Sequence, residues 1–211
     1  KNGVKAYIPT PLLDTDAVKE IVSEISELTE LSFTMNKVKN ENWNLHWESN
    51  YPAVVINRKC VIRANFHTPF KDIEHEIIIN PKMSFGTGHH ETTSLMINEM
   101  FNLDFKEKSV LDMGCGTGIL AILASKLGAR DLLGIDIDEW AFTNAKENAS
   151  LNNILNIHFI HGDASDIGNS KYDIILANIN RNVLLNDFET YVASMETSAE
   201  ILLSGFLEQD L

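Results

Sequence analysis

Cysteine is scarce in this sequence, with only Cys60 and Cys115 among 211 residues. Two cysteines cannot build the disulfide framework of a small secreted protein, so we expect free thiols and a cytoplasmic location. Long hydrophobic runs are also missing, and none approaches the roughly 20 apolar residues that a membrane-spanning helix needs. No basic and then apolar leader follows Lys1. We therefore expect no membrane segment.

Basic residues are a minority, because 17 Lys and Arg stand against 30 Asp and Glu, for a formal net charge of -13. Binding a phosphate backbone requires a basic patch, so this charge argues against direct contact with nucleic acid. The same charge would favour encounter with a basic protein. With 44% apolar residues at this length, we expect a monomer built from one large globular domain and part of a smaller one.

The first eighty residues divide into two segments. Residues 1–40 show a short strand at 4–9 and a helix from about 14 to 31 with apolar residues at helical spacing. One strand and one helix cannot bury a core alone, so we interpret this segment as part of a small α+β domain. Residues 41–80 are interpreted as a linker, in which Trp43 and Trp47 anchor packing, and a β-rich segment with strands near 53–57, 60–66 and 74–80.

From Ser109 onward, short apolar strands alternate regularly with helices. The predicted strands are 109–115, 131–137, 156–162, 172–179 and 200–207, and the predicted helices are 118–127, 139–151 and 182–195. This alternation is typical of an α/β fold, a doubly wound Rossmann-like parallel sheet covered on both faces. We assign residues 81–211 to this domain, with further C-terminal strands missing. Ligands bind at the carboxyl ends of such strands.

The sharpest local signal is VLDMGCGTGILA at residues 110–121, where Gly114, Gly116 and Gly118 join a strand to a helix. Nicotinamide, flavin and adenosylmethionine proteins all use such a turn, which lets the backbone approach a ligand closely. The spacing here is Gly-x-Gly-x-Gly, whereas the dinucleotide fingerprint is Gly-x-Gly-x-x-Gly. Asp112 would repel a pyrophosphate but could hold the ammonium of a methionine moiety. This pattern favours an adenosylmethionine-type ligand.

Polar residues end the next three strands. Asp136 could accept hydrogen bonds from both hydroxyls of a ribose, and Asp138 is the alternative strand-end acid. Asp163 could accept from an adenine amino group, although an aspartate after glycine is also common in turns. Asn178 can both donate and accept, and it is our candidate for touching the methyl acceptor. A buried turn asparagine is the alternative for Asn178.

The segment FGTGHHETT at residues 85–93 raises the question of a metal site. His89, His90 and Glu91 are adjacent, so on a helix their side chains would diverge by about 100° each. A metal site would need another histidine, such as His67 or His75. The plainer interpretation is a helix start, with Glu91 in the first turn and a threonine hydroxyl from residues 92 or 93 near the unpaired amides.

The combination of FGTGHHETT, LDMGCGTGILA, GIDID and ANI resembles the bacterial methyltransferases that modify large-subunit ribosomal protein 11. The resemblance runs from about Trp43 to Leu211. It implies that residues 85–93 cap an S-adenosylmethionine site, and that four positions of this chain contact that cofactor. Together with two residues argued above, the predicted cofactor-binding residues are Thr93, Gly114, Gly116, Asp136, Asp163 and Asn178. Asn178 is also the predicted catalytic residue, and no metal is expected.

This resemblance implies methyl transfer to the N-terminal amine and lysine side chains of that ribosomal protein. It further implies that residues 1–40 belong to a substrate-recognition domain, which moves on a linker around residues 32–52. Other hypotheses remain. A class I methyltransferase acting on a small molecule or nucleic acid is disfavoured by the charge and by the fourth-strand sequence ANIN. A silent S-adenosylmethionine-binding scaffold and a nicotinamide dehydrogenase are the others.

Overall fold

The computed structural model describes residues 8, 12–26, 33–36, 51–80 and 86–206. The chain forms two compact units, residues 1–43 and 44–211. In the first unit, helix α1 (Thr15–Ser26) begins where Asp14 Oδ1 accepts hydrogen bonds from the amides of Asp16 and Ala17, both at 3.0 Å. Most of the predicted strand at 4–9, the end of the predicted helix and both linker tryptophans lie outside the described residues.

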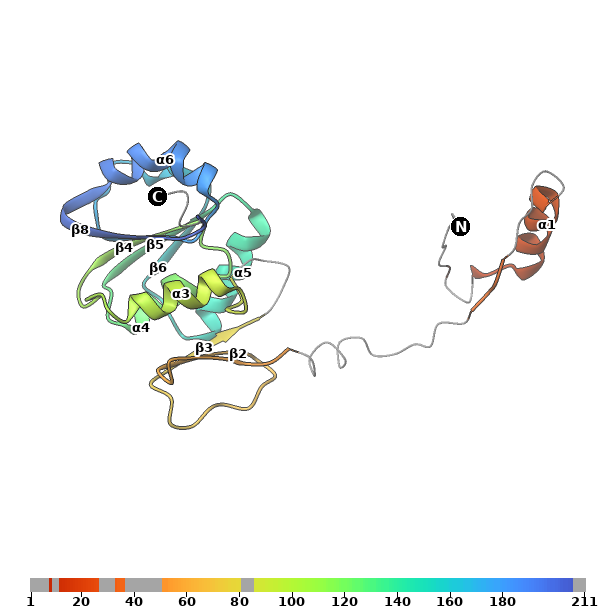
Figure 1. The fold of residues 1–211 in the computed structure, drawn as a ribbon, viewed down its shortest axis with the longest axis horizontal. Helices are drawn as coiled ribbons and strands as arrows, with labels where there is room; N and C mark the ends of the chain where they lie inside the picture. The colour runs from red at the N-terminus through yellow and green to blue at the C-terminus, as the bar shows by residue number, and fades with distance from the viewer. Residues whose placement is uncertain (1–7, 9–11, 27–32, 37–50, 81–85, 207–211) are drawn as a thin grey trace. The chain divides into compact units, whose positions relative to one another are not determined.

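The second unit contains a five-stranded sheet in the order β6-β5-β4-β7-β8 (Figure 1). Its strands are β4 (Ser109–Met113), β5 (Asp131–Asp136), β6 (Ile157–His161), β7 (Tyr172–Ala177) and β8 (Met195–Leu203). Every neighbouring pair is parallel, which confirms the predicted α/β sheet. The strand order reverses between β4 and β7, so this is the place where such a sheet binds its ligand.

Helices cover both faces of the sheet (Figure 1). On one face lie α3 (Glu91–Met100), α4 (Ile119–Lys126) and α5 (Glu139–Leu151), and on the other lie α6 (Arg181–Ala193) and the 3₁₀ helix η2 (Ala164–Ile167). Alternate strand residues feed two cores, since Val110 packs on the α4 side and Leu111 on the α6 side. None of the helices described is long and apolar enough to cross a membrane.

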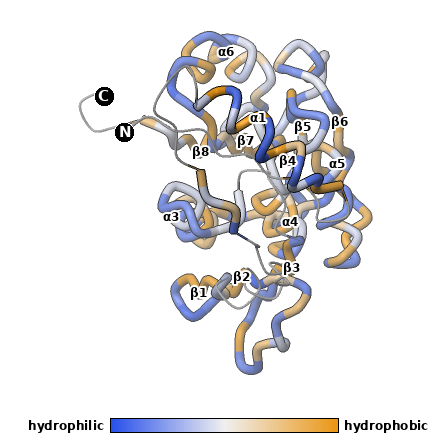
Figure 2. Tube along the Cα trace, turned by 90° about the vertical axis from the view of Figure 1, so that its right-hand side faces the viewer, coloured by the Kyte–Doolittle hydropathy of each residue, from blue (hydrophilic) through white to orange (hydrophobic). Residues whose placement is uncertain are grey.

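The β-rich segment forms a small sheet of its own, in the order β1-β2-β3. Strand β1 (Val54–Ile56) pairs antiparallel with β2 (Cys60–Ala64), and β2 pairs parallel with β3 (His75–Ile79). Figure 2 shows this sheet as a separate layer beneath α4. Buried side chains of all three strands belong to the same core as α3 and α4. The small sheet is therefore an integral part of the second unit.

Two asparagines of α5 and a third at its C-terminal cap hold the outer edge of β3. Asn152 accepts from the Ile78 amide at 2.9 Å and donates to the Ile78 carbonyl at 2.7 Å. Asn148 accepts from the Asn80 amide at 2.8 Å, and Asn144 donates to the Asn80 carbonyl at 3.2 Å. Residues four apart share a helix face, so this row replaces a neighbouring strand. The spacing of the asparagines is the sequence signal for this contact, which was not predicted.

Two neighbouring predicted boundaries are wrong. The helix predicted to reach residue 195 ends at Ala193, and β8 begins at Met195 rather than at 200. The stretch METSAE lacks the apolar alternation by which strands are recognised. The pairing of β8 with β7 also shifts register between Tyr172 and Ile174, and Ser198 has a positive φ of 67°. An irregular strand of polar and small residues leaves no clear pattern in the sequence.

We predict that Arg63→Met destabilises the fold by about 2 to 4 kcal/mol. Arg63 is buried, and its Nε and Nη2 donate to the two carboxylate oxygens of Glu76 at 2.7 and 3.0 Å. Its Nη1 also donates to the carbonyls of Ala64 and His67. The bonds from Arg63 lower the pKa of Glu76, burial opposes this shift, and the Phe70 amide lowers the pKa further. Removing the arginine therefore leaves a partly buried carboxylate and two carbonyls without their donor.

Urea unfolding checks this prediction, with Arg130→Met as the matched control. Arg130 pairs with its neighbour Asp131 on the surface, where water screens the pair, so its loss should change stability little. Equal midpoint shifts for the two variants would contradict the structural role of Arg63.

Candidate active site

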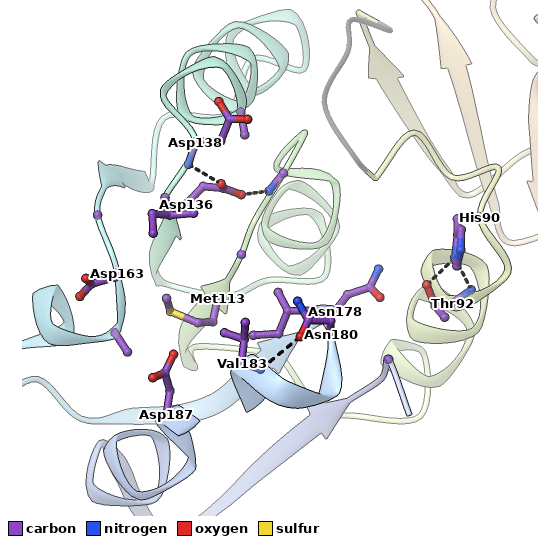
Figure 3. Close-up of a pocket in the computed structure, with 18 residues that line it drawn as sticks. His90, Thr92, Met113, Asp136, Asp138, Asp163, Asn178, Asn180, Val183 and Asp187 are labelled. Carbon is purple, nitrogen blue, oxygen red and sulfur yellow. Dashed lines mark hydrogen bonds between the residues drawn. The ribbon is translucent and has the colours of Figure 1, made fainter. Parts of the chain in front are cut away.

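A cavity of about 700 Å³ opens at the carboxyl ends of β4, β5, β6 and β7 (Figure 3). This volume is within the usual range of small-molecule sites. Five of the six predicted cofactor-binding residues line it: Gly114, Gly116, Asp136, Asp163 and Asn178. The sixth, Thr93, is fully buried and does not line the cavity. Residues up to 64 positions apart in the chain thus meet at one site, as parallel-sheet topology predicts.

The glycine turn forms one wall of the cavity. The amides of Gly114 and Cys115 both donate to the Ile135 carbonyl, at 2.8 and 3.0 Å, so the turn wraps around the end of β5. Gly114 has φ of 66°, and a Cβ there would lie 2.2 Å from Cγ2 of Ile179. No other residue type fits this position without moving the wall. Gly114 and Gly116 both line the cavity, and their contact with a ligand stays a prediction.

Asp136 both lines the cavity and fixes the turn. Its Oδ2 accepts from the Gly116 amide at 2.7 Å, and its Oδ1 accepts from the Asp138 amide at 2.9 Å (Figure 3). A carboxylate oxygen has two lone pairs, so each oxygen keeps one for a hydroxyl. Asp138 has a different local role, because its side chain accepts from the Trp140 amide and caps α5. This difference favours Asp136 as the ribose ligand.

Asp163 combines both interpretations that the sequence left open. Its Oδ1 accepts from the amide and the hydroxyl of Ser165, at 2.8 and 2.6 Å, and it caps η2. The Ser165 hydroxyl, and then its amide, hold the pKa of Asp163 below the usual value. The residue is thus an ionised turn aspartate that also lines the cavity, and it retains acceptor capacity for an amino group.

The carboxamide of Asn178 is held from both ends. Its Nδ2 donates to Thr93 Oγ1 at 3.1 Å, and its Oδ1 accepts from Ser204 Oγ at 2.5 Å. These partners come from α3 and from the residue after β8. The structure therefore gives Thr93 a positioning role toward Asn178, and the predicted cofactor contact of Thr93 stays a prediction. Ser204 is a site residue that sequence reasoning missed, because nothing local marks it.

Residues 86–93 join the glycine turn and α3. Thr117 Oγ1 donates to the Gly86 carbonyl at 2.5 Å, which ties the segment to the turn. The predicted helix start at Glu91 is confirmed. Its cap differs from the prediction, because Nδ1 of His90, rather than a threonine hydroxyl, accepts from the Thr92 amide at 3.3 Å (Figure 3). His90 can cap the helix because its backbone is extended, as a capping residue requires.

The histidines considered for a metal site have separate partners. His89 Nε2 meets the Pro52 carbonyl, His90 caps α3, and His67 Nδ1 accepts from the Ala64 amide. Among the residues that the structure describes, no three His, Cys, Asp or Glu side chains are grouped to hold a metal ion. The adjacent histidines of the 85–93 segment therefore serve backbone contacts.

Further residues from α6 line the cavity, and the sequence analysis did not single them out. Val183 and Asp187 lie four apart on one helix face, and Asn180 caps the helix. Tyr191 Oη donates to Asp187 Oδ2 at 3.4 Å. Four carboxylates line the cavity, and no Lys or Arg does so within the described part of the chain. The cavity thus suits a cationic ligand better than a phosphate.

Asp112 does not reach the cavity, contrary to the expectation that it holds an ammonium. It is 1% exposed, and its Oδ2 accepts from the Ala121 amide at 3.0 Å in the first turn of α4. Burial raises the pKa of Asp112 to about 7, the charge of Asp136 adds to the rise, and the Ala121 bond opposes it. Asp112 therefore stabilises the start of α4 and carries a pH dependence.

We predict that Asp112→Asn flattens the pH dependence of stability. Because the folded pKa of about 7 exceeds the ordinary 3.8, the folded state binds more protons between these values. The free energy of unfolding therefore falls as pH rises from about 4 to 7, by up to about 4 kcal/mol from this group. Asparagine keeps an acceptor for Ala121 and removes the titration.

Chemical denaturation at a series of pH values between 4 and 8 measures this difference. Asp104→Asn, on an exposed aspartate, is the control and should keep the wild-type slope. A slope for Asp112→Asn that matches the control would contradict the assignment.

The sequence matches the family model described as "Ribosomal protein L11 methyltransferase (PrmA)" over residues 1–211. It is 48% identical to the ribosomal protein L11 methyltransferase of Phocaeicola vulgatus and 46% identical to that of Bacteroides thetaiotaomicron. Both alignments cover 100% of this chain and 76% of the relative. The crystal structure of a ribosomal protein L11 methylase from Lactobacillus delbrueckii subsp. bulgaricus is similar, with a TM-score of 0.67, 31% identity, and coverage of 74% of this chain and 80% of that chain.

Proposed function

Since this chain belongs to the ribosomal protein L11 methyltransferase family, we propose that it methylates the N-terminal amine and lysine side chains of ribosomal protein L11. The chain is an S-adenosylmethionine-dependent protein methyltransferase. The assignment of the active site to this cavity rests on one structural observation. The glycine turn, the strand-end carboxylate of Asp136 and the doubly held Asn178 line a single cavity.

The residues of the cavity fit S-adenosylmethionine. Gly114 and Gly116 line the cavity, where the methionine moiety would lie beside them, and Asp136 has lone pairs for the ribose hydroxyls. Asp163 would accept from the adenine amino group. The cofactor carries a sulfonium and an ammonium, and a cavity with four carboxylates and no described Lys or Arg matches those charges. Thr93 would contribute to the site indirectly, because its hydroxyl accepts from Asn178 and holds that carboxamide in place.

When bound, S-adenosylmethionine supplies a methyl group that an amine nitrogen takes by direct displacement. Asn178 Oδ1 keeps one lone pair after accepting from Ser204. With this lone pair it would accept an N–H of the substrate amine, which orients the amine's own lone pair toward the methyl group. A lysine amine with an ordinary pKa of about 10.4 must first lose a proton, whereas an α-amine near 7.7 to 8.0 is already partly neutral. Once the cationic cofactor offsets the carboxylates of the cavity, the apolar side chains of Met113, Ile179 and Val183 would disfavour the ammonium form of the acceptor. A dedicated general base is not required.

The remaining features of the proposal concern partners and organisation. The net charge of -13 and the carboxylates of the cavity support a basic protein substrate and argue against direct binding of nucleic acid. We propose a cytoplasmic monomer. Residues 1–40 would belong to the substrate-recognition domain, residues 41–80 to the linker and β-rich segment, and residues 81–211 to the methyltransferase domain. The linker around residues 32–52 would let the recognition domain turn between successive amines.

The substrate is tested with isotopically labelled S-adenosylmethionine and an unfractionated mixture of unmodified large-subunit components. We expect label in ribosomal protein L11 alone, with cofactor binding demonstrated separately by calorimetry. Label in ribosomal RNA, or in other proteins to the same extent, would contradict the proposed substrate. Cofactor binding without any transfer would instead favour a silent binding protein.

A further inference from the structure

His89 connects the segment 86–93 to a distant part of the same unit. Its Nε2 lies 2.9 Å from the Pro52 carbonyl oxygen. A carbonyl can only accept, so Nε2 carries the hydrogen and donates it. Nδ1 is then left to accept from Thr87 Oγ1 at 3.4 Å. Cofactor and metal binding are not needed to explain this histidine, because both of its ring nitrogens have protein partners.

Aromatic packing strengthens the same contact. The His89 ring lies 4.5 Å from the ring of Tyr51, and Tyr51 also contacts Phe66 and His67, both at 6.4 Å between ring centres. Tyr51 is half-buried, and burial raises the pKa of its hydroxyl while the Thr87 side chain opposes that rise. We call His89, Thr87, Tyr51 and Pro52 the latch. It holds residues 51–52 against residues 87–89 by a hydrogen bond and ring contacts.

Residues 86–93, which include Thr87 and His89 of the latch, also reach the cavity. Gly86 is tied to the glycine turn through Thr117, and Ser94 Oγ donates to the Gly88 carbonyl at 2.9 Å. Gly88 has φ of 85°, and a Cβ there would lie 2.4 Å from Cδ1 of Ile62, so the segment packs closely on β2 at this position. Next in the chain, His90 and Thr92 line the cavity. Thr93 holds Asn178. A closely packed path therefore runs from Pro52 to the catalytic amide.

We propose that His89 is a positioning residue that couples cofactor occupancy of the cavity to the segment Tyr51–Pro52. This inference rests on the proposed function, because it requires S-adenosylmethionine to bind in the cavity. Tyr51 follows the boundary between the two units by only eight residues. An occupied cavity orders the 86–93 segment and, through the latch, residues 51–52. Release of the cofactor loosens both, which gives the recognition domain its opportunity to turn between methyl transfers.

Hydrogen exchange with and without S-adenosylmethionine tests the coupling. In the wild type, we expect the cofactor to slow exchange both in residues 86–94 and in residues 53–57. His89→Phe keeps a ring against Tyr51 but loses the donor to Pro52, so protection should be confined to residues 86–94. His89→Gln keeps an N–H donor and should restore the response at 53–57. His158→Phe, on an exposed histidine of β6, should behave as the wild type.

Affinity provides the second measurement. We expect His89→Phe to raise the Kd for S-adenosylmethionine about two- to fivefold, as the loss of one neutral hydrogen bond would. If His89 had a purely structural role, His89→Phe would lower the stability of the protein but would change the protection of residues 86–94 and 53–57 together. The inference is overturned if the wild type binds cofactor with no change at 53–57, or if His89→Phe transmits protection as the wild type does. A wild type that binds no S-adenosylmethionine would overturn the proposed function itself.

Discussion

Asp136→Ala is expected to weaken S-adenosylmethionine binding by about 100-fold or more. The variant would lose the two charge-assisted hydrogen bonds that we propose between Asp136 and the ribose, each worth about 1.5 to 3 kcal/mol. It also leaves the amides of Gly116 and Asp138 without their acceptor, so the glycine turn loses the carboxylate that holds it. Both effects act on the cofactor, and both follow from the position of one side chain at the end of β5.

Isothermal calorimetry measures this loss, and thermal unfolding shows whether the variant is folded. Asp138→Ser is the matched control, because serine can still cap α5 while the second carboxylate of the strand end is removed. We expect that control to change the Kd by less than about fivefold. A larger loss for Asp138→Ser than for Asp136→Ala would assign the ribose to Asp138 and contradict our choice between the two.

Asn178→Ala is expected to lower kcat for ribosomal protein L11 by about 100- to 1000-fold, with less than a threefold change in the Kd for cofactor. The reason is that the carboxamide is fixed by Thr93 and Ser204 before any substrate arrives. A preorganised group that orients the amine acts mainly in the transition state. Steady-state kinetics with purified substrate, together with calorimetry for the cofactor, separates the two quantities.

Two supporting variants examine the same arrangement. Thr93→Val and Ser204→Ala each remove one partner of Asn178 and leave the amide itself. We expect each to reduce kcat less than Asn178→Ala does, because one hydrogen bond still holds the carboxamide. If Asn178→Ala weakened cofactor binding as much as turnover, its role toward the acceptor would be wrong and a purely cofactor-binding role would replace it.

The features that could be predicted from the sequence are those with local causes. The alternation of apolar strands and helices marked the parallel sheet, and the glycine spacing marked the turn at residues 114–118. Because parallel strands bring their carboxyl ends to one edge, the sequence alone predicts that Asp136, Asp163 and Asn178 lie close together. The structure places all three in one cavity.

The features that could not be predicted depend on contacts between distant segments. Asn178 meets partners 85 and 26 positions away, and neither carries a local signal. Asp112 was misplaced because neighbouring strand residues point to opposite faces, so Met113 lines the cavity while Asp112 faces α4. His90 was considered as a metal ligand, and its capping role depends on a backbone conformation that composition does not reveal.

The most direct test of the central claim is intact-mass spectrometry of purified, unmethylated ribosomal protein L11 after incubation with this protein and S-adenosylmethionine. We predict a series of added methyl groups, located by peptide mapping on the N-terminal amine and on lysine side chains, and additions that accumulate far more slowly with Asn178→Ala. An unchanged mass, under conditions where calorimetry shows the wild type to be saturated with cofactor, would contradict methyl transfer to this substrate.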